Sequence, residues 1–486
     1  MSSTLKSKTV SGLGWSAADA FSAQGVNFLV GLILARLLSP AEYGLIGIAM
    51  IFIVILSGFV DCGFSSALIR RKEVSDKDYN TMFIINLGMS IVVYFILFFC
   101  APLIAGFFER EEVTSLLRVL SLTVVIQAVA TVQNTILTKR IDFKTKTKAT
   151  VIAAITSGAI GITTAFCGWG VWALAAQQLS IQMTNTLCLC IFNRWLPKLS
   201  FSKESFRYMW GFGWKMMLSG FLNNTWNQLY QAVVGKCYSP ATLGQYSRAN
   251  QFAQFFSSNF TSIFQRVTYP ALAEVQDERE RMVAAYRKII KTSMFVTAVC
   301  MISLGAISEP FIRCLIGSKW HQAATFLPLI CISMSLYPLH AINLNMLQIQ
   351  GRSDIFLFLE IIKKIIAVGP LCLGIFVGIY WMLWGGIIVG IISFFLNSYY
   401  TGKELGYSSW QQLKDVTPSY LIAFIVAVSV YFFKFLPVSS FVILPIQFVV
   451  GIAVFFGICE IFKPEEYLEV KSLVIEYLKK AKNTIK

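Results

Sequence analysis

The sequence predicts an all-α integral membrane protein with about fourteen transmembrane helices. Apolar residues make up 56% of its 486 residues and charged residues only 14%, and the mean hydropathy is +0.65. Soluble domains carry about a quarter charged residues, so this balance excludes an ordinary soluble fold. A helix needs roughly 20 apolar residues to cross the hydrocarbon core of a bilayer. Such stretches follow one another along nearly the whole chain.

The apolar stretches define the expected spans and leave no room for a soluble domain. The first stretch has no small-residue cleavage site, so we interpret it as a span and not as a cleaved signal. The expected spans are 13–35, 44–68, 82–106, 115–136, 149–167, 171–192, 209–235, 246–266, 292–312, 324–347, 355–377, 380–400, 418–436 and 439–462.

Lysine and arginine are distributed unevenly between the two sides of these spans. With the N-terminus inside, 30 of the 41 basic residues fall on one side and 8 on the other. Three lysines, Lys215, Lys363 and Lys364, lie within spans. Positive charge marks cytoplasmic loops. The split therefore predicts a multi-pass membrane protein with both termini in the cytoplasm.

An internal repeat divides the chain into two halves. Gly12-Leu-Gly-Trp15 recurs as Gly211-Phe-Gly-Trp214, and Ser39-Pro-Ala41 with Gly44 recurs as Ser239-Pro-Ala241 with Gly244. Six spans per repeat is an even number, so the halves enter the membrane in the same direction and are related by a pseudo-two-fold along the membrane normal. The expected parts are an N-terminal six-helix bundle (1–208), a second six-helix bundle (209–410), two additional helices (411–462) and a cytoplasmic amphipathic tail (463–486).

Motifs of soluble catalysis are missing from the sequence. There is no GxxxxGK[ST] phosphate loop, no HExxH and no GxSxG. The chain has only two histidines, and its eleven cysteines are scattered without a Cys-x-x-Cys. We therefore expect a secondary-type transporter and not an enzyme, with no bound cofactor or metal and no nucleic-acid partner. Transport would be coupled to a proton or sodium gradient.

Charged residues within spans carry the functional hypotheses, because charge is costly in lipid and usually faces a cavity or a partner. Asp19 and Asp61 are the acids of the first half, and Lys215 is a matching cation in the second. A polar cavity that binds an anionic head group and couples to an ion would use them. Interhelical salt bridges are the alternative. We favour the cavity for Lys215 and Asp19.

Two further sets of polar residues stay open to both interpretations. In span 355–377, Glu360 and Lys364 form an i,i+4 pair, and there we favour structural pairing over ion coupling. In span 209–235, Asn223, Asn227 and Gln231 share one face beside aromatic residues. This amide stripe suits sugar hydroxyl groups, and it equally suits hydrogen bonding between helices.

Several motifs together resemble the polysaccharide transporter family of the multidrug/oligosaccharidyl-lipid/polysaccharide (MOP) flippase superfamily. The resemblance covers the chain up to about residue 410. It rests on Ile33-Leu-Ala-Arg-Leu-Leu-Ser-Pro40, Glu42-Tyr-Gly44, Asp61-Cys-Gly-Phe64, Ala67-Leu-Ile-Arg-Arg71, Gly168-Trp-Gly-Val-Trp-Ala-Leu174, Gln177-Gln178, Leu243-Gly-Gln-Tyr-Ser-Arg248, Val267-Thr-Tyr-Pro270 and Gly317-Ser-Lys-Trp320.

The resemblance implies two six-helix bundles around a central cavity that opens alternately to each side. It also implies a cargo of undecaprenyl-diphosphate carrying an oligosaccharide, exported for surface polysaccharide synthesis. Lys215, Arg36, Arg70 and Arg248 are the candidate cations for the pyrophosphate. The expected partners are the lipid-linked cargo, the bilayer and other polysaccharide assembly proteins, and the chain itself is expected to be a monomer.

Other transporter and enzyme classes remain as alternatives. A peptidoglycan lipid-precursor flippase would work by the same mechanism. A multidrug exporter of the same superfamily would need a cavity dominated by acids. An integral membrane polymerase or acyltransferase would need a large outer loop or a catalytic histidine. In the tail, Tyr467, Val470 and Val474 share one face, which fits either a helix on the inner leaflet or one packed under the bundle.

Overall fold

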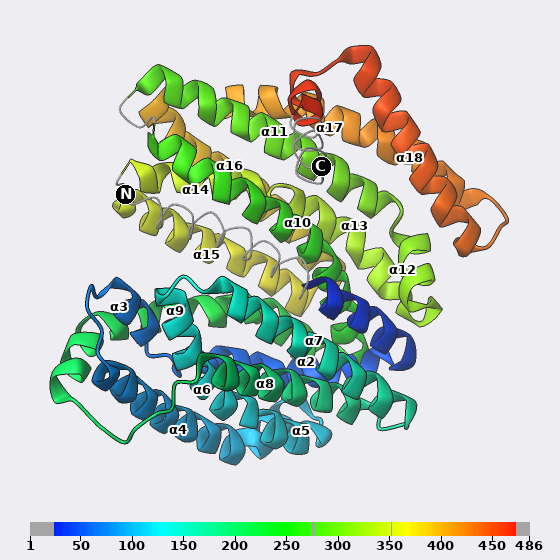
Figure 1. Cartoon of the computed structure of the whole chain (residues 1–486). Helices are drawn as coiled ribbons and strands as arrows, with labels where there is room; N and C mark the ends of the chain where they lie inside the picture. Colours follow the sequence, from blue (N-terminus) through cyan, green and yellow to red (C-terminus); the bar gives the residue numbers. More distant parts are fainter. Residues whose placement is uncertain (1–23, 275–277, 351, 473–486) are drawn as a thin grey trace, which may run out of the picture. The chain divides into compact units, whose positions relative to one another are not determined.

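The computed structural model describes residues 24–274, 278–350 and 352–472, and every regular element in these ranges is helical (Figure 1). The chain divides after Gly244 into two compact units, Met1–Gly244 and Gln245–Lys486, which we call unit 1 and unit 2. Asp19 and residues 13–23 of the first expected span lie outside the described residues. Part of the predicted tail, residues 473–486, also lies outside them. The two units are described separately below.

Unit 1 begins with a helix at Gln24–Leu37. Its other helices are α2 (Pro40–Ser57), α3 (Phe64–Arg70), α4 (Asp76–Phe108), α5 (Glu112–Leu120), α6 (Leu122–Lys139), α7 (Phe143–Phe166), α8 (Val171–Asn193) and α9 (Lys203–Cys237), followed by the start of α10 (Pro240–Glu274).

Unit 2 holds the rest of α10 and all later helices. These are α11 (Arg279–Ala306), α12 (Ser308–Ile316), η1 (Ser318–Trp320), α13 (His321–Ser335), α14 (Tyr337–Ile349), α15 (Ser353–Phe376), α16 (Ile379–Leu405), α17 (Ser409–Tyr431), η2 (Phe432–Phe435) and α18 (Ser440–Phe462).

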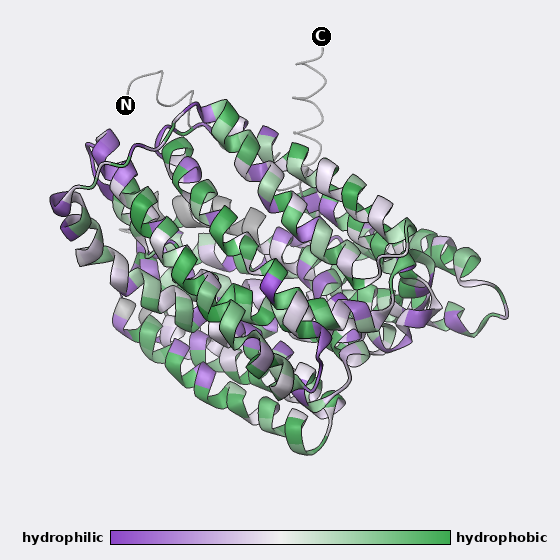
Figure 2. Ribbon diagram, turned by 90° about the horizontal axis from the view of Figure 1, so that it is seen from below, coloured by the Kyte–Doolittle hydropathy of each residue, from purple (hydrophilic) through white to green (hydrophobic). Residues whose placement is uncertain are grey.

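Many helices present apolar side chains outward. In the described part of the chain, nine helical stretches are long and apolar enough to cross a membrane. In the most apolar 18-residue window of α18, only 11% of the residues are buried, and apolar residues run along most helices in Figure 2. Apolar side chains remain on the outside only where the surrounding solvent is itself apolar. The chain is therefore a multi-pass membrane protein.

Three of the expected spans are pairs of helices, and a fourth, 292–312, crosses the junction of α11 and α12 at Ile307. The expected span 44–68 consists of α2 and α3, separated by six residues, Gly58–Gly63. The expected span 115–136 consists of α5 and α6, which meet at Ser121. The expected span 324–347 consists of α13 and α14, which meet at Leu336. Hydropathy does not detect such breaks, because Ser121, Leu336 and all of Gly58–Gly63 except Asp61 are as apolar or small as their neighbours.

The repeated Ser-Pro-Ala-x-x-Gly motifs meet each other in the structure. A Cβ on Gly44 would lie 1.8 Å from the Pro240 carbonyl oxygen, and a Cβ on Gly244 would lie 1.9 Å from the Pro40 carbonyl oxygen. The starts of α2 and α10 therefore touch reciprocally, backbone to backbone. Only glycine permits so close an approach. This reciprocity gives the sequence repeat a physical role.

Helix α9 packs on α2, α3 and α4 and thus belongs to unit 1. The repeat places the same segment at the start of the second six-span bundle. The structural division after residue 244 and the repeat boundary between 208 and 209 are different properties of the chain. The repeat boundary stays a prediction.

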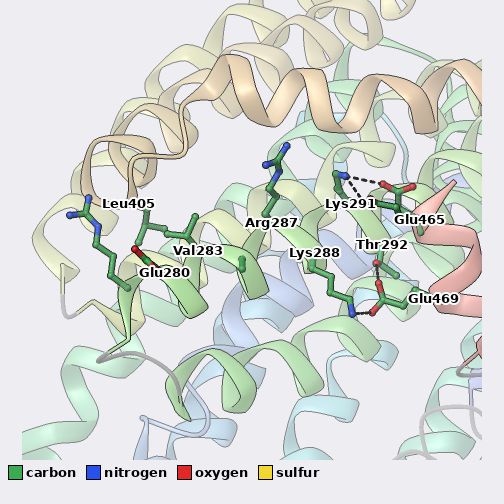
Figure 3. A pocket seen from close by; sticks show the side chains of 12 residues that line it. Glu280, Val283, Arg287, Lys288, Lys291, Thr292, Leu405, Glu465 and Glu469 are labelled. Atoms are coloured by element: carbon green, nitrogen blue, oxygen red, sulfur yellow. Dashed lines mark hydrogen bonds and ion pairs between the residues drawn. The ribbon is translucent and has the colours of Figure 1, made fainter.

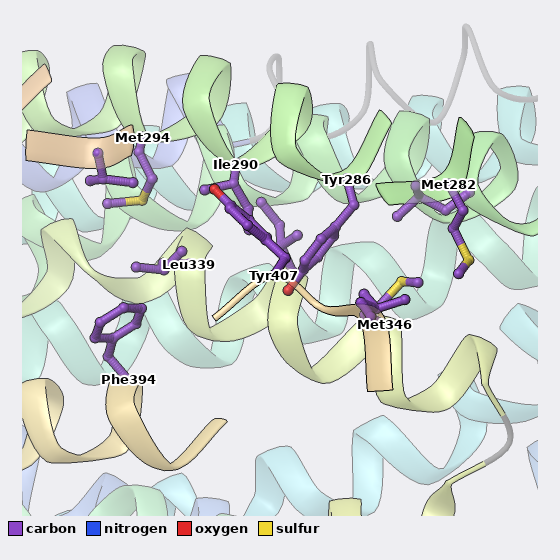
Figure 4. Close-up of a cluster of buried hydrophobic side chains, with 12 residues drawn as sticks. Met282, Tyr286, Ile290, Met294, Leu339, Met346, Phe394 and Tyr407 are labelled. Carbon is purple, nitrogen blue, oxygen red and sulfur yellow. The ribbon is translucent and has the colours of Figure 1, made fainter. Parts of the chain in front are cut away.

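Unit 2 has an apolar core with a polar network beside it. Met282, Tyr286 and Ile290 of α11 face Leu339, Met346 and Phe394 in this core (Figure 4). Asn343 accepts hydrogen bonds from the Tyr286 hydroxyl (2.8 Å) and the Thr401 hydroxyl (2.7 Å). Its amide nitrogen donates to Gln412 (3.1 Å). Buried polar groups that satisfy one another in this way fix the relative register of α11, α14, α16 and α17.

We predict that Gly44→Ala or Gly244→Ala lowers the free energy of unfolding by about 2–3 kcal/mol, because the added methyl group would overlap a backbone carbonyl that cannot rotate away. Gly88→Ala is the matched control, since a Cβ there meets nothing within 4 Å and alanine favours the helix. Thermal unfolding in detergent measures the difference. Equal melting temperatures for all three variants would contradict the close contact.

Candidate functional site

The break between α2 and α3 is the most unusual backbone feature of unit 1. Cys62 (φ 50°) and Gly63 (φ 70°) are consecutive residues with left-handed backbone. Such a conformation is unfavourable for a non-glycine residue and persists only where the surroundings enforce it. Broken helices at membrane depth are tolerated only where other protein groups satisfy the exposed backbone. The break therefore depends on its neighbours.

Helix α9 supplies much of that support. A Cβ on Gly63 would lie 2.4 Å from the Gly213 carbonyl oxygen, and a Cβ on Gly213 would lie 2.5 Å from the Cys62 carbonyl oxygen. Farther along α9, the Asn224 amide donates to the Val54 carbonyl oxygen near the end of α2 (3.2 Å). Asn224 lies beside the predicted stripe of Asn223, Asn227 and Gln231, and its bond joins two helices.

Asp61 lies in the break and is the centre of a small polar cluster. Its Oδ1 accepts hydrogen bonds from the Ser65 backbone N–H (3.2 Å) and the Ser65 hydroxyl (2.5 Å). The Thr135 hydroxyl of α6 donates to Ser65 Oγ (2.9 Å). The Asn86 side chain lies beside the carboxylate, is fully buried, and has no other hydrogen-bond partner within the described chain. Asp61 is therefore a half-buried carboxylate among groups that can donate or accept a hydrogen bond.

A basic pocket of about 440 Å³ opens at the far end of α3. It is lined by Ala67, Arg70, Arg71, Lys72, Tyr208, Gly211 and Phe212. The Arg70 guanidinium lies 5.5 Å from the Phe212 ring centroid, and that of Arg71 lies 4.8 Å from the Tyr208 ring centroid. Arg71 also pairs with Asp78 (2.7 Å). Three cations and two aromatic rings thus converge on one hollow, which suits an anionic group joined to a ring-shaped one.

Lys139 holds the basic end of α3 in place. Its ammonium group donates to the carbonyl oxygens of Leu68 (3.1 Å) and Ile69 (3.3 Å), and also to that of Arg71. The last carbonyl groups of a helix have no partner within the helix. A cation that binds them also interacts favourably with the helix dipole. Lys139 therefore orders the segment that carries Arg70, Arg71 and Lys72.

The predicted residues of α9 extend away from this pocket. Lys215 is exposed, three residues beyond Phe212, and its ammonium lies 5.9 Å from the Trp214 ring centroid. Asn223 and Asn227 are exposed in the next turns, and Gln231 is half-buried. Residues three and four apart share a helix face. Lys215 therefore continues the basic surface along α9, with amides beyond it.

The other predicted site residues lie on other helices or outside the described residues. Arg36 is exposed on the helix Gln24–Leu37, and Asp19 lies outside the described residues. In unit 2, Arg248 bonds to Gln251. Glu360 pairs with Lys363 at 2.5 Å, so the predicted partner Lys364 is wrong, although the expected structural pairing within this span is found.

Sequence reasoning missed several members of the site. Arg71, Lys72 and Lys139 were not among the predicted site residues, although the run Arg70-Arg71-Lys72 is itself a basic signal. Tyr208 and Phe212 carried no signal, because they are 130 or more residues away in a helix full of aromatic residues. Within the described ranges, no group of three or more His, Cys, Asp or Glu side chains could hold a metal ion.

Comparisons with known proteins identify the family. The model of the family described as "Polysaccharide biosynthesis protein" matches residues 33–325. The succinoglycan biosynthesis transport protein ExoT of Rhizobium meliloti is 26% identical over 77% of this chain and 76% of its own length. The lipopolysaccharide biosynthesis protein WzxC of Escherichia coli is 24% identical over 84% of both chains.

Solved structures show the same fold. The lipid II flippase MurJ in an inward closed conformation superposes with a TM-score of 0.73 at 17% identity, covering 93% of this chain and 98% of its own. An inward-facing multidrug resistance MATE family transporter of the MOP superfamily gives 0.57 at 17% identity, covering 85% and 98%. The chain therefore has the fold of the MOP-superfamily transporters, and it belongs to the polysaccharide biosynthesis protein family.

Proposed function

We propose that the chain is a flippase that moves undecaprenyl-diphosphate-linked oligosaccharide repeat units across the bacterial inner membrane, for surface polysaccharide synthesis. The observation that carries this proposal is the pocket of Arg70, Arg71 and Lys72 beside Tyr208 and Phe212. Family membership supports the same function, because ExoT and WzxC are named for succinoglycan transport and lipopolysaccharide biosynthesis.

The pocket chemistry fits the two polar parts of such a cargo. A pyrophosphate and its sugars cannot cross hydrocarbon unaided, because each unsatisfied polar group costs several kcal/mol there. Arginine binds phosphate oxygens in a bidentate manner, and aromatic rings offer flat faces to pyranose rings. Lys215 and the amides Asn223, Asn227 and Gln231 would receive the polar group next along α9, and Arg36 and Arg248 would serve at the outer mouth.

An apolar cavity in unit 2 suits the polyprenyl chain. It has a volume of about 670 Å³ and lies among α10, α11, α12, α17 and α18. Its walls are mainly aromatic and aliphatic, including Phe256, Phe295, Val426, Phe448 and Phe455. A hydrocarbon chain gains about 0.8 kcal/mol for each buried CH₂ group. The cavity is therefore apolar enough to hold part of a hydrocarbon chain.

The proposed architecture has fourteen spans in two six-helix bundles plus two C-terminal helices, with both termini in the cytoplasm. The reciprocal contacts of Gly44 with Pro240 and of Gly244 with Pro40 support it. Transport would proceed by alternating access and would need neither ATP nor a bound cofactor. The protein would act as a monomer beside other polysaccharide assembly proteins.

Ion coupling would use Asp61, with Asp19 and Glu360 as the further candidates. Asp61 is supported by its place in a helix break and by the Ser65 and Thr135 hydroxyls linked to it. Broken helices form the ion sites of many secondary transporters. Glu360 has weaker support, because Lys363 already neutralises it.

A peptidoglycan lipid-precursor flippase is the second candidate. Its cargo also joins a polyprenyl pyrophosphate to a sugar, and the pocket chemistry fits both cargoes equally. The likeness to MurJ, at 17% identity, shows the fold alone. A multidrug exporter fits less well, because cations and not acids line the pocket in unit 1.

We predict that replacing both Arg70 and Lys72 with glutamine slows translocation about a hundredfold to ten-thousandfold, because each of the two charged hydrogen bonds to a phosphate contributes about 1.5–3 kcal/mol. Both residues are exposed, so the fold should persist. The measurement is translocation of several lipid-linked oligosaccharides in reconstituted vesicles. Lys203→Gln, an exposed cation at the start of α9, should retain full activity. Unchanged translocation by the double variant would refute the pocket assignment.

Lys215→Ala should abolish most translocation with unchanged expression, because it removes the cation that follows the pocket along α9. Lys215→Arg should retain activity, since the charge and reach are kept. The same vesicle assay measures both variants. Normal activity of the alanine variant would exclude Lys215 from the cargo path.

Asp61→Asn should uncouple transport from the ion gradient while preserving the helix break, because the asparagine oxygen can still accept from Ser65. In vesicles, translocation driven by a pH or sodium gradient should fall to the rate seen without the gradient. Asp76→Asn, an exposed acid in the first turn of α4, should respond normally to the gradient. A full gradient response in Asp61→Asn would show that coupling uses another residue.

A further inference from the structure

The N-terminal turns of α11 carry four cations that line one pocket. Arg279, Arg287, Lys288 and Lys291 line a pocket of about 1020 Å³ in unit 2 (Figure 3). Lys291 is the last charged residue of α11, and the rest of the helix, from Thr292 to Ala306, carries no charge. The charge distribution puts this end of α11 on the cytoplasmic side. Lys288 and Lys291 therefore lie at the depth of the lipid head groups.

The segment after α18 folds back over this pocket. Helix α18 ends at Lys463 with left-handed backbone (φ 44°), followed by Pro464, and residues 465–472 form a further helical stretch. Tyr467 anchors it: its side chain is buried, its ring lies 6.2 Å from that of Phe456, and its hydroxyl donates to Glu460 (2.6 Å).

Carboxylates from this returning segment neutralise the lysines of α11. Lys288 pairs with Glu469 at 2.9 Å, and Lys291 pairs with Glu465 at 3.2 Å and Glu466 at 3.6 Å. The Thr292 hydroxyl also donates to Glu469 (3.1 Å). Figure 3 shows the Lys288, Thr292 and Glu469 side chains converging on one point.

The arrangement is that of an anion site filled by the chain's own acids. Lys288 and Thr292 both bind Glu469, whereas Lys291 binds Glu465 and Glu466. Ammonium and hydroxyl groups are the hydrogen-bond donors that a phosphate group requires. Three of the four carboxylates that line the pocket, Glu465, Glu466 and Glu469, come from the returning segment. Without them, the lining would hold four cations and one acid, Glu280. Anionic head groups of the inner leaflet attract basic residues at this depth.

We propose that Lys288, Lys291 and Thr292 form a binding site for the phosphate group of an anionic phospholipid, and that Glu465, Glu466 and Glu469 occupy it as an intramolecular competitor. The lipid and the returning segment would exclude each other. Anionic lipid would thus release the segment from α11, whereas Tyr467 would keep it attached to α18. The site is separate from the cargo pocket of unit 1 and does not depend on which cargo is carried.

The test compares lipid binding by the full chain and its variants in detergent. Phosphatidylglycerol, phosphatidylcholine or inorganic phosphate is added, and the melting temperature is followed by tryptophan fluorescence. The variant Glu465→Gln, Glu466→Gln, Glu469→Gln should bind phosphatidylglycerol about fivefold more tightly for each lysine released, which corresponds to about 1 kcal/mol per cation. Lys288→Gln with Lys291→Gln should remove the stabilisation by phosphatidylglycerol. Glu111→Gln with Glu112→Gln, two exposed acids of unit 1, is the control and should bind like the unmodified chain.

A charge swap separates binding from folding. Lys288→Glu with Glu469→Lys keeps an ion pair at the same place, so it should unfold at the temperature of the unmodified chain while binding phosphatidylglycerol more weakly. Equal phosphatidylglycerol affinity in the unmodified chain and the triple glutamine variant would overturn the competition. Equal stabilisation by inorganic phosphate and phosphatidylglycerol would overturn the assignment to a lipid.

Discussion

A helix that stops inside a membrane must pass its backbone hydrogen bonds to other groups, and this constraint shapes unit 1. No water is available in hydrocarbon to satisfy the exposed N–H and C=O groups. Between α2 and α3, Asp61 therefore accepts from the Ser65 N–H, and Asn224 of α9 donates to the Val54 carbonyl oxygen. Lys139 donates hydrogen bonds to the last carbonyl groups of α3. The polar groups of the candidate site are present because the helix is broken.

The same constraint explains why the residues of the candidate site lie close to the break between α2 and α3. Each group that hydrogen-bonds the exposed backbone at the break is polar and is held in place by its neighbours. Such a group brings a fixed dipole or charge into an apolar environment at little further cost in free energy. Lys139 orders the end of α3, and Arg70 and Lys72 then project from an ordered segment. Close packing of Gly63 on Gly213 places the aromatic side chains of α9 beside these cations. A continuous helix would have provided none of these contacts.

The sequence predicted much of the fold and only part of the site, for physical reasons. Hydropathy is a property of contiguous residues, so it located the helices; it did not locate the breaks, where single residues such as Ser121 and Leu336 change the backbone without changing the apolar character. Asp61 and Lys215 were named because charge is costly within a span, and Arg70 was named with the resemblance to the transporter family. Lys139, Asn224 and Tyr208 were missed, because their roles depend on partners about 70 to 170 residues away. The pairing of Glu360 with Lys363 depends on rotamers that spacing alone does not specify.

The cations of the two units have different neighbours, and this difference affects how each could bind an anionic ligand. In unit 1, Arg70 lies against an aromatic face, which attracts a cation without neutralising it. In unit 2, carboxylates of the returning segment neutralise Lys288 and Lys291. An incoming phosphate meets available positive charge in the first case and must displace an acid in the second. The basic surface of unit 1 is therefore suited to binding at any time, whereas that of unit 2 is suited to binding that depends on the position of the returning segment.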